Sequence, residues 1–318
     1  MLHRFTLPRV LVLMVLACLP ASAVERGVML REGVIYINPS TDSAKLSNIG
    51  VGHEVAILDR SPGWLNVMGT VQVSPDPENE SDRDVTGWIK DKGVVTASTP
   101  DGDKILYGAA FDCERQASQW GGRRGAALDA MHLYASIPEY FPKSPLAAEA
   151  AYRAADIRWQ IESADAASRP SAKAQDPELH YQIDEDYMRQ VMKKFPHTKW
   201  ADLAAYHLIQ NKLCGDWENE AKCPEREAGY YLKYVQQYPQ SPKVPEALYN
   251  AAWRYSALVQ IYTSNNDAKK AGEAEARSLE LAKKLIAQYP DDVDWSSRAQ
   301  RLIYMVQNKI PTYGNVVE

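Results

Sequence analysis

The sequence contains few of the residues that build metal centres or nucleophilic active sites. Its 318 residues include four cysteines and six histidines, and the histidines are scattered rather than placed at zinc-ligand spacings. The glycine-rich stretch Gly121–Gly125 lacks the Lys-Ser or Lys-Thr pair of a phosphate-binding loop. We therefore predict no catalytic residue, no cofactor and no bound metal, and we expect the chain not to be an enzyme.

An excess of positive charge is also missing. The chain has 36 lysines and arginines against 41 aspartates and glutamates, which gives a formal net charge of −5. Proteins that bind nucleic acid need a basic surface to neutralise phosphates. We therefore predict no nucleic-acid partner.

Long apolar runs are confined to the N-terminus. Two arginines precede the apolar stretch Val10–Leu19, which is too short to span a bilayer, and Ala21-Ser22-Ala23 matches a cleavage site. We predict that residues 1–23 are a secretory signal peptide and that the mature protein begins near Val24, exported to the periplasm. Loss of the two arginines would take the formal charge from −5 to −7.

The N-terminus contains a second pattern as well. Val15-Leu16-Ala17-Cys18 resembles a bacterial lipobox, in which Cys18 would carry the lipid. Lipidation at Cys18 would anchor the protein and place it at the outer membrane, whereas cleavage after Ala23 would leave it soluble. The sequence leaves both alternatives open.

The remaining cysteines fall in the part of the chain that would be exported, where the compartment is oxidising. Cys214 and Cys223 bracket the stretch GDWENEAK between two predicted helices. We predict a disulfide that pins this connection; the alternative is two unpaired small residues. Cys113 has no predicted partner, and a buried, unreactive role is the usual one for such a residue.

Residues 24–97 show the pattern of a small antiparallel barrel. Short runs rich in β-branched and aromatic residues alternate with turn residues. The expected strands include Gly33–Ile37, Val55–Leu58, Trp64–Val67 and Thr86–Ile89. We predict that the barrel ends near residue 97 and that residues 98–114 form a linker.

This segment resembles a bacterial SH3-like domain. The residues that carry the resemblance are Tyr36–Ser40, Gly50-Val51-Gly52, Gly63-Trp64 with Val67, and Gly87-Trp88-Ile89. In that family the domain is a binding module, often for cell-wall peptides. The resemblance implies that Trp64 and Trp88 contact a partner, although either could instead belong to the barrel core. The acidic stretch Ser74–Asp84 departs from the family, and we predict a solvated hairpin tip there.

Residues 115–310 have helical spacing and an internal repeat. An aromatic residue, a proline, a variable residue and a helix-capping residue recur in this order, with the prolines 54, 43 and 51 residues apart. Each copy predicts a helix, a tight turn and a second helix that begins at the capping residue. Residues 311–318 are expected to be a C-terminal tail. The turn residues are Phe141, Pro142 and Ser144; Phe195, Pro196 and Thr198; Tyr238, Pro239 and Ser241; and Tyr289, Pro290 and Asp292.

The residues around the prolines repeat as well. Positions nine and five before each proline predict one buried stripe on the first helix. A small residue eight positions after and a tyrosine ten positions after mark the second helix in the first three copies, and the fourth copy lacks them, as expected of a terminal unit. The stripe residues are Leu133 and Ile137, Tyr187 and Val191, Tyr230 and Tyr234, and Leu281 and Leu285; the pairs are Ala150 and Tyr152, Ala204 and Tyr206, and Ala247 and Tyr249.

Over residues 115–308 this signature resembles tetratricopeptide-like repeats of two bacterial envelope proteins. One is the lipoprotein of the outer-membrane β-barrel assembly machinery, and the other is the periplasmic coordinator that works with the Tol-Pal system. The predicted fold class is therefore multidomain, with a small all-β SH3-like barrel followed by an all-α tetratricopeptide-like solenoid. The resemblance implies an adaptor in outer-membrane assembly or envelope coordination.

We predict a non-enzymatic scaffold of the cell envelope whose repeats bind envelope proteins or peptides. Exposed aromatic residues are the expected anchors. Two alternatives are a peptidoglycan-binding module based on the SH3-like domain and a cell-wall hydrolase in which Cys113 is the only candidate nucleophile. The candidate anchors on the helices, each of which could equally be core, are Tyr134, Tyr181, Trp200, Trp253 and Tyr255.

Overall fold

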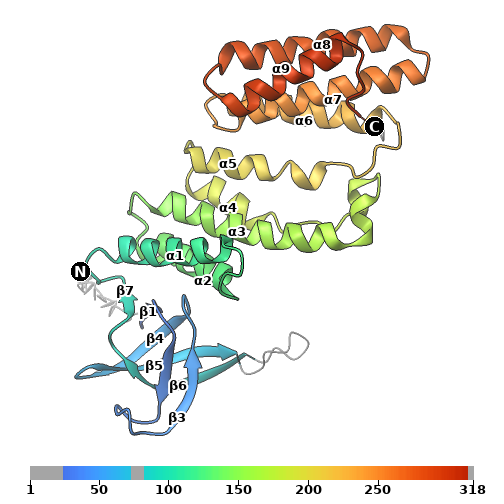
Figure 1. The fold of residues 1–318 in the computed structure, drawn as a ribbon. Coiled ribbons are helices and arrows are strands. Elements are labelled where there is room, and N and C mark those ends of the chain that lie inside the picture. The colour runs from blue at the N-terminus through green and yellow to red at the C-terminus, as the bar shows by residue number, and fades with distance from the viewer. Residues whose placement is uncertain (1–23, 73–81, 314–318) are drawn as a thin grey trace, which may run out of the picture.

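The structure is a computed structural model that describes residues 24–72 and 82–313 (Figure 1). The predicted signal peptide, Cys18 and most of the predicted hairpin tip therefore lie outside the described residues. Within them, a sheet is followed by a run of helices, which confirms the predicted order of a β-domain and an α-domain.

The N-terminal part is one antiparallel sheet of seven strands in the order β3-β2-β6-β5-β4-β1-β7. Alternate residues of the strands face inward, and Ile35, Val67 and Ile89 are fully buried in its core. Gly63 provides the positive φ that the tight turn between β4 and β5 requires. The strands are β1 (Glu25–Met29), β2 (Gly33–Tyr36), β3 (Lys45–Ile49), β4 (Glu54–Ser61), β5 (Trp64–Gln72), β6 (Asp82–Lys90) and β7 (Val94–Thr96).

Nine α-helices follow in the described part of the chain, and they stack into an elongated array above the sheet (Figure 1). Short 3₁₀ segments lie at Pro170–Lys173, Pro177–Leu179 and Gln210–Lys212. The helices are α1 (Gly102–Ser118), α2 (Ala126–Tyr140), α3 (Ala147–Ser168), α4 (Asp186–Lys194), α5 (Lys199–His207), α6 (Lys222–Gln237), α7 (Val244–Ser264), α8 (Ala268–Gln288) and α9 (Val293–Gln307).

The prediction of a linker at residues 98–114 is wrong for most of this range, because α1 begins at Gly102. Leu106, Ala110 and Cys113 form a buried stripe on α1 that packs against α2. Val28 and Val95 of the sheet belong to the same apolar core. The first helices are thus continuous with the sheet in their packing rather than tethered to it by a flexible segment.

The four aromatic-proline turns have the same backbone conformation, although their sequences differ. Phe141, Phe195, Tyr238 and Tyr289 end helices α2, α4, α6 and α8 with φ between −131° and −127° and ψ between 53° and 60°. In each, the amide N–H of the aromatic residue donates to the carbonyl four residues earlier, over 2.8–3.0 Å. The repeated helix–turn–helix unit predicted from the sequence is therefore present four times.

The predicted helix starts hold for two of these turns and fail for two. The side chains of Thr198 and Asp292 cap α5 and α9 by accepting from the N–H three residues later. Ser144 and Ser241 instead accept from the N–H two residues later, in an extra turn that precedes α3 and α7. Those two helices begin three residues after the serine.

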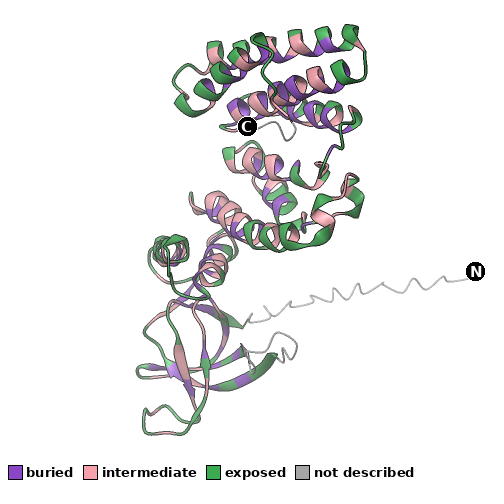
Figure 2. Cartoon of the chain, turned by 45° about the vertical axis from the view of Figure 1, so that its right-hand side comes forward, coloured by how far each residue is buried: buried purple, intermediate pink, exposed green. Residues whose placement is uncertain are grey.

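Small residues bring the helices together as the repeat predicts. Buried positions alternate with exposed ones along the stacked helices (Figure 2). Ala150, Ala204 and Ala247 are fully buried. The tyrosine two residues after each alanine is half-buried and packs on an aromatic residue of the following unit: Tyr152 on Trp200, Tyr206 on Tyr234, and Tyr249 on Trp295, with ring centroids 5.5, 5.1 and 5.3 Å apart. Among the described residues, no helix has the length and apolar character needed to cross a membrane.

Candidate functional site

An apolar hollow with converging polar groups lies where α7, α8 and α9 meet. Its volume is about 730 Å³, within the ordinary range of ligand sites. Val259 and Ala271 supply apolar walls, and Gln260, Thr263 and Glu275 supply polar groups. We call this hollow the α7–α8 groove.

The groove exists because α9 is shorter than the helix against which it packs. Helix α8 has 21 residues and α9 has 15, so α9 stops short by about 9 Å at 1.5 Å per residue. The uncovered end of α8 carries the small residues Ala268, Ala271 and Gly272. Their size leaves a depression rather than a ridge beside α7.

The chain leaves α9 in a way that directs its last described residues across α7. Lys309 has a left-handed φ of 57°, its N–H donates to Val306, and the N–H of Ile310 donates to Met305. This pair of hydrogen bonds is a Schellman motif, and Pro311 then prevents further helix. The chain beyond α9 is therefore not helical.

The segment that follows α9 is held by one face of α7. Trp253, Ser256 and Gln260 are spaced three and four residues apart, so they line up along the helix. The indole Nε1 of Trp253 donates to the carbonyl of Thr312 over 3.1 Å. The amide oxygen of Gln260 accepts from the N–H groups of Thr312 (3.2 Å) and Tyr313 (2.9 Å). The hydroxyls of Ser256 and Thr312 are hydrogen-bonded at 2.8 Å.

An aromatic stack completes this contact. The ring of Tyr313 lies 4.9 Å from Trp217, and Trp217 lies 5.2 Å from Trp253, measured between ring centroids. Burial raises the pKa of the Tyr313 hydroxyl above its ordinary value. We call Trp217, Trp253, Ser256 and Gln260 the α7 docking face.

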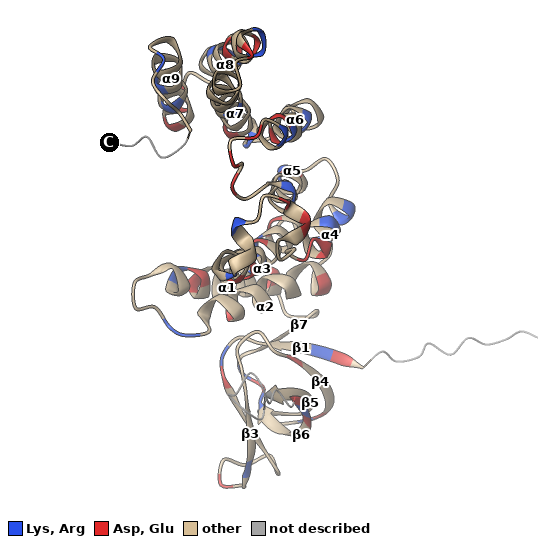
Figure 3. Cartoon of the chain, turned by 90° about the vertical axis from the view of Figure 1, so that its right-hand side faces the viewer, with Lys and Arg blue, Asp and Glu red and all other residues tan. Residues whose placement is uncertain are grey.

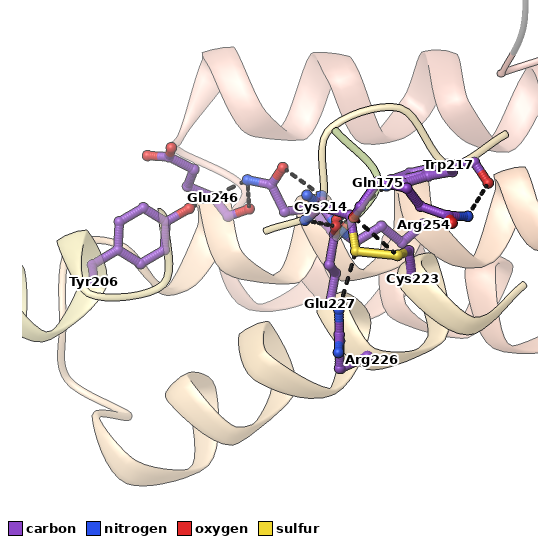
Figure 4. A network of polar contacts seen from close by, with 10 residues as sticks. Gln175, Tyr206, Cys214, Trp217, Cys223, Arg226, Glu227, Glu246 and Arg254 are labelled. Atoms are coloured by element: carbon purple, nitrogen blue, oxygen red, sulfur yellow. Dashed lines mark hydrogen bonds and ion pairs between the residues drawn. A yellow bond between two sulfur atoms is a disulfide. The ribbon is translucent and has the colours of Figure 1, made fainter. Parts of the chain in front are cut away.

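Trp217 comes from the connection between α5 and α6, which a buried polar network holds in place (Figure 4). One oxygen of Glu227 accepts from the Cys214 N–H (2.8 Å) and from Trp217 Nε1 (3.2 Å). Its other oxygen accepts from Arg254 Nε at 2.7 Å. The carboxylate thus ties the connection to both α6 and α7.

The disulfide predicted between Cys214 and Cys223 is present, which confirms that part of the prediction. It closes the connection that contains Trp217 at its base on α6. Gln175 also donates to the Trp217 carbonyl over 3.3 Å. These contacts with α6 and Gln175 therefore fix the position of the Trp217 ring, which does not depend on Tyr313.

Two further observations concern metal-ligating and nucleophilic side chains among the described residues. These residues contain no group of three or more His, Cys, Asp or Glu that could hold a metal ion. Cys113 is buried, and its burial raises the pKa of the thiol, whereas a nucleophilic cysteine needs a lowered pKa. Charges of both signs are mixed along the helices (Figure 3).

The two tryptophans predicted as anchors on the sheet lie close together. Trp64 is buried, packs edge-on against Tyr36 at 5.6 Å, and lies under Lys90 Nζ at 3.8 Å. Trp88 is half-buried opposite Tyr36 on the neighbouring strand. Trp64 is therefore largely core, and Trp88 is the more accessible of the two.

The predicted anchors on the helices separate into core and surface positions. Tyr134 is fully buried and donates to Glu114 over 2.7 Å, so it cannot contact a partner. Trp200 and Tyr255 are half-buried, and Tyr181 is exposed beside Arg169, whose guanidinium lies 3.9 Å from its ring. Of the five, only Trp253 belongs to the α7 docking face.

The sequence patterns did not identify Trp217, Ser256, Gln260 and Tyr313 as site residues. The spacing of Ser256 and Gln260 from the predicted anchor Trp253, on one helical face, was a usable signal for these two positions on α7. No pattern in the sequence indicated that residues near position 312 return to that face. Comparison of the sequence with protein-family models and with curated proteins gives no match.

Proposed function

We propose that this chain is a non-enzymatic scaffold of the bacterial cell envelope that binds extended segments of partner proteins through its helices. The observation that carries the proposal is the common backbone conformation of the four aromatic-proline turns. Such repetition favours a tetratricopeptide-like solenoid, whose stacked helices offer an extended surface to peptides or partner domains. The curved antiparallel sheet in front of it is proposed to be an SH3-like barrel.

The groove and the segment beside it support a role in peptide binding. The α7–α8 groove is open to solvent along residues such as Thr263, and it continues into the α7 docking face. That face already holds a non-helical stretch of chain by its main-chain groups. A surface that binds the main chain of one such segment has the chemistry needed for another.

The proposed location rests on the N-terminal sequence and on the disulfide. A disulfide at Cys214–Cys223 is expected to persist in an oxidising compartment such as the periplasm. The mass of the purified mature chain tests export. A chain that begins at Val24 supports a soluble adaptor, and a fatty-acid label that disappears in Cys18→Ala supports a lipoprotein. A chain that retains residue 1 in the cytoplasm contradicts the proposal.

In-cell crosslinking tests the partner class. A photoreactive residue at Thr263 lies in the α7–α8 groove, and a second one at Leu58, exposed on the sheet, is the matched control. We expect Thr263 to capture envelope proteins that Leu58 does not capture. Subunits of the β-barrel assembly machinery would indicate outer-membrane assembly, and Tol-Pal or cell-wall synthesis proteins would indicate envelope coordination. No specific product at Thr263 would contradict the proposed scaffold.

A peptidoglycan-binding role is the second candidate, and the half-buried Trp88 beside Tyr36 is the observation that favours it. The test is co-sedimentation with purified sacculi. It requires the full mature chain, because Val28 and Val95 of the sheet share a core with α1 and α2. Retention on sacculi that Trp88→Ala abolishes would support this role, and no retention would eliminate it.

A further inference from the structure

We propose that the α7 docking face is a peptide-binding site whose ligand is a non-helical partner segment with a hydroxyl residue followed by an aromatic residue. In the free protein the chain's own Thr312 and Tyr313 occupy it. The inference rests on the proposed function and deepens it, because it names the site and the chemistry of the partner segment.

The site recognises a peptide main chain. Gln260 accepts from two successive N–H groups, and Trp253 donates to the carbonyl between them. Two successive N–H groups reach one oxygen only where the backbone bends, and the chain has a bend at Tyr313. The three hydrogen bonds therefore require a bent backbone and place no demand on the side chains of the ligand. The interior of a helix could not make them, because its N–H and carbonyl groups are already paired.

Two side-chain contacts then select the ligand. The Ser256 hydroxyl is paired with that of Thr312 at 2.8 Å, so a serine or threonine is favoured at this position. The next residue lies against Trp217 at 4.9 Å with its ring tilted by 31°, a geometry that favours an aromatic side chain. The preferred ligand therefore has the order hydroxyl, aromatic.

The docking face is formed without its occupant. Glu227 fixes Trp217, the disulfide closes the connection that carries it, and Arg254 next to Trp253 is itself paired with Glu227. None of these interactions involves residues beyond position 308. A preorganised site binds a competing segment without first being rebuilt.

The occupant, in contrast, is held at the surface. Ile310 and Pro311 are exposed, and Thr312 and Tyr313 are only half-buried. The α7–α8 groove lies next to Thr312 and Ile310, so a longer ligand could extend into it. An external segment that fills both the docking face and the groove would gain contacts that the chain's own segment lacks.

The probe is a fluorophore-labelled, amidated peptide with the sequence of residues 308–314, Asn-Lys-Ile-Pro-Thr-Tyr-Gly. It is titrated into the full mature chain and into its Tyr313→Ala variant. A tethered segment competes at a high effective concentration, so we expect the variant to bind the peptide about tenfold more tightly than the wild type, or better. A peptide with alanine in place of tyrosine should bind at least about tenfold more weakly than the parent peptide.

Two further variants identify the site. In the Tyr313→Ala background, Gln260→Ala should weaken peptide binding by about tenfold through the loss of two main-chain hydrogen bonds. Gln288→Ala, at the other end of α8, is the matched control and should leave binding unchanged. Absence of binding to the Tyr313→Ala variant, or equal binding after Gln260→Ala, overturns the proposal.

The last outcome to distinguish is that the C-terminal segment of a second copy of this chain occupies the docking face. Light scattering of the wild type and of Tyr313→Ala distinguishes it, because exchange of C-terminal segments would make the wild type a dimer and the variant a monomer. That result overturns the assignment to another protein. Failure of the peptide test is separable from failure of the proposed scaffold, since crosslinking from Thr263 can succeed when the docking face binds nothing.

Discussion

Arg254 and Glu227 form an ion pair, with Nε and Oε2 2.7 Å apart, whose side chains are only 6% and 1% exposed. Arg254 also lies over the ring of Tyr231, 4.5 Å from its centroid, and donates to Asn250. The pair links α6 to α7 and supports the connection that carries Trp217. The geometry of the α7 docking face therefore depends on two charges that solvent does not reach.

Neutralising one member of this pair should be costly. Glu227→Gln keeps the shape of the side chain but leaves the Arg254 guanidinium buried without a counter-charge. We expect the free energy of unfolding to fall by about 3–5 kcal/mol, measured by urea denaturation. Glu280→Gln is the control, because Glu280 pairs with Arg277 at the surface and should cost less than about 1 kcal/mol. Equal effects of the two variants would show that burial of the pair is unimportant.

The disulfide should contribute measurably to stability, since it joins residues nine positions apart and restricts the unfolded chain. The double variant Cys214→Ser, Cys223→Ser should lose about 2–3 kcal/mol in urea unfolding. Reductant should destabilise the wild type by a similar amount and should not affect the double variant. A wild type insensitive to reductant would contradict the prediction.

The close approach of helices at the repeated alanines gives a third prediction. Ala247 is fully buried, and a larger side chain there must push α6 and α7 apart. Ala247→Leu should reduce the free energy of unfolding by about 1–3 kcal/mol or more. Ala276→Leu, at an exposed position of α8, should have an effect close to zero. Equal stability of the two variants would indicate that the site has room for a leucine.

Local patterns in the sequence predicted the repeated unit well because its determinants are local. A proline and a helix cap act within a few residues, so all four turns were found. Exact burial was harder to predict. Tyr187 was expected in the buried stripe, yet it is exposed under Arg158, and its neighbour Met188 is buried instead. A shift by one residue rotates a helical position by about 100°, and only packing with the next helix decides it.

The docking face could not be predicted, because its contacts join distant parts of the chain. Trp253 and Thr312 are 59 positions apart, and Gln260 and Tyr313 are 53 apart. Trp217 comes from the connection between α5 and α6 and is held in the same place by its hydrogen bond to Glu227 on α6. The linker prediction failed for a related reason. The buried stripe on α1 contains few strongly apolar residues, so the sequence alone did not reveal it. Its burial depends on contacts with α2 and with Val28 and Val95 of the sheet.

The junction between sheet and helices should make stability depend on pH. His132 on α2 is partly buried, with its ring centroid 5.7 Å from that of His53. Burial, and then repulsion from His53, lowers the pKa of His132, while Asp129 opposes the shift. The unfolded chain therefore binds a proton at a higher pH than the folded chain does. Stability is highest above the unfolded pKa and falls as the pH drops through it toward the lowered folded value.

Urea denaturation between about pH 7.5 and 5.5 would test this dependence, because that window brackets the ordinary histidine pKa and lies above those of most carboxylates. We expect the free energy of unfolding to decrease with pH in the wild type and to decrease less steeply in His132→Gln. His197→Asn is the matched control, since His197 is exposed at a turn and has a positive φ that asparagine tolerates. The His132 assignment is wrong if His132→Gln and His197→Asn both keep the wild-type slope, and the junction would then be insensitive to protonation of this ring.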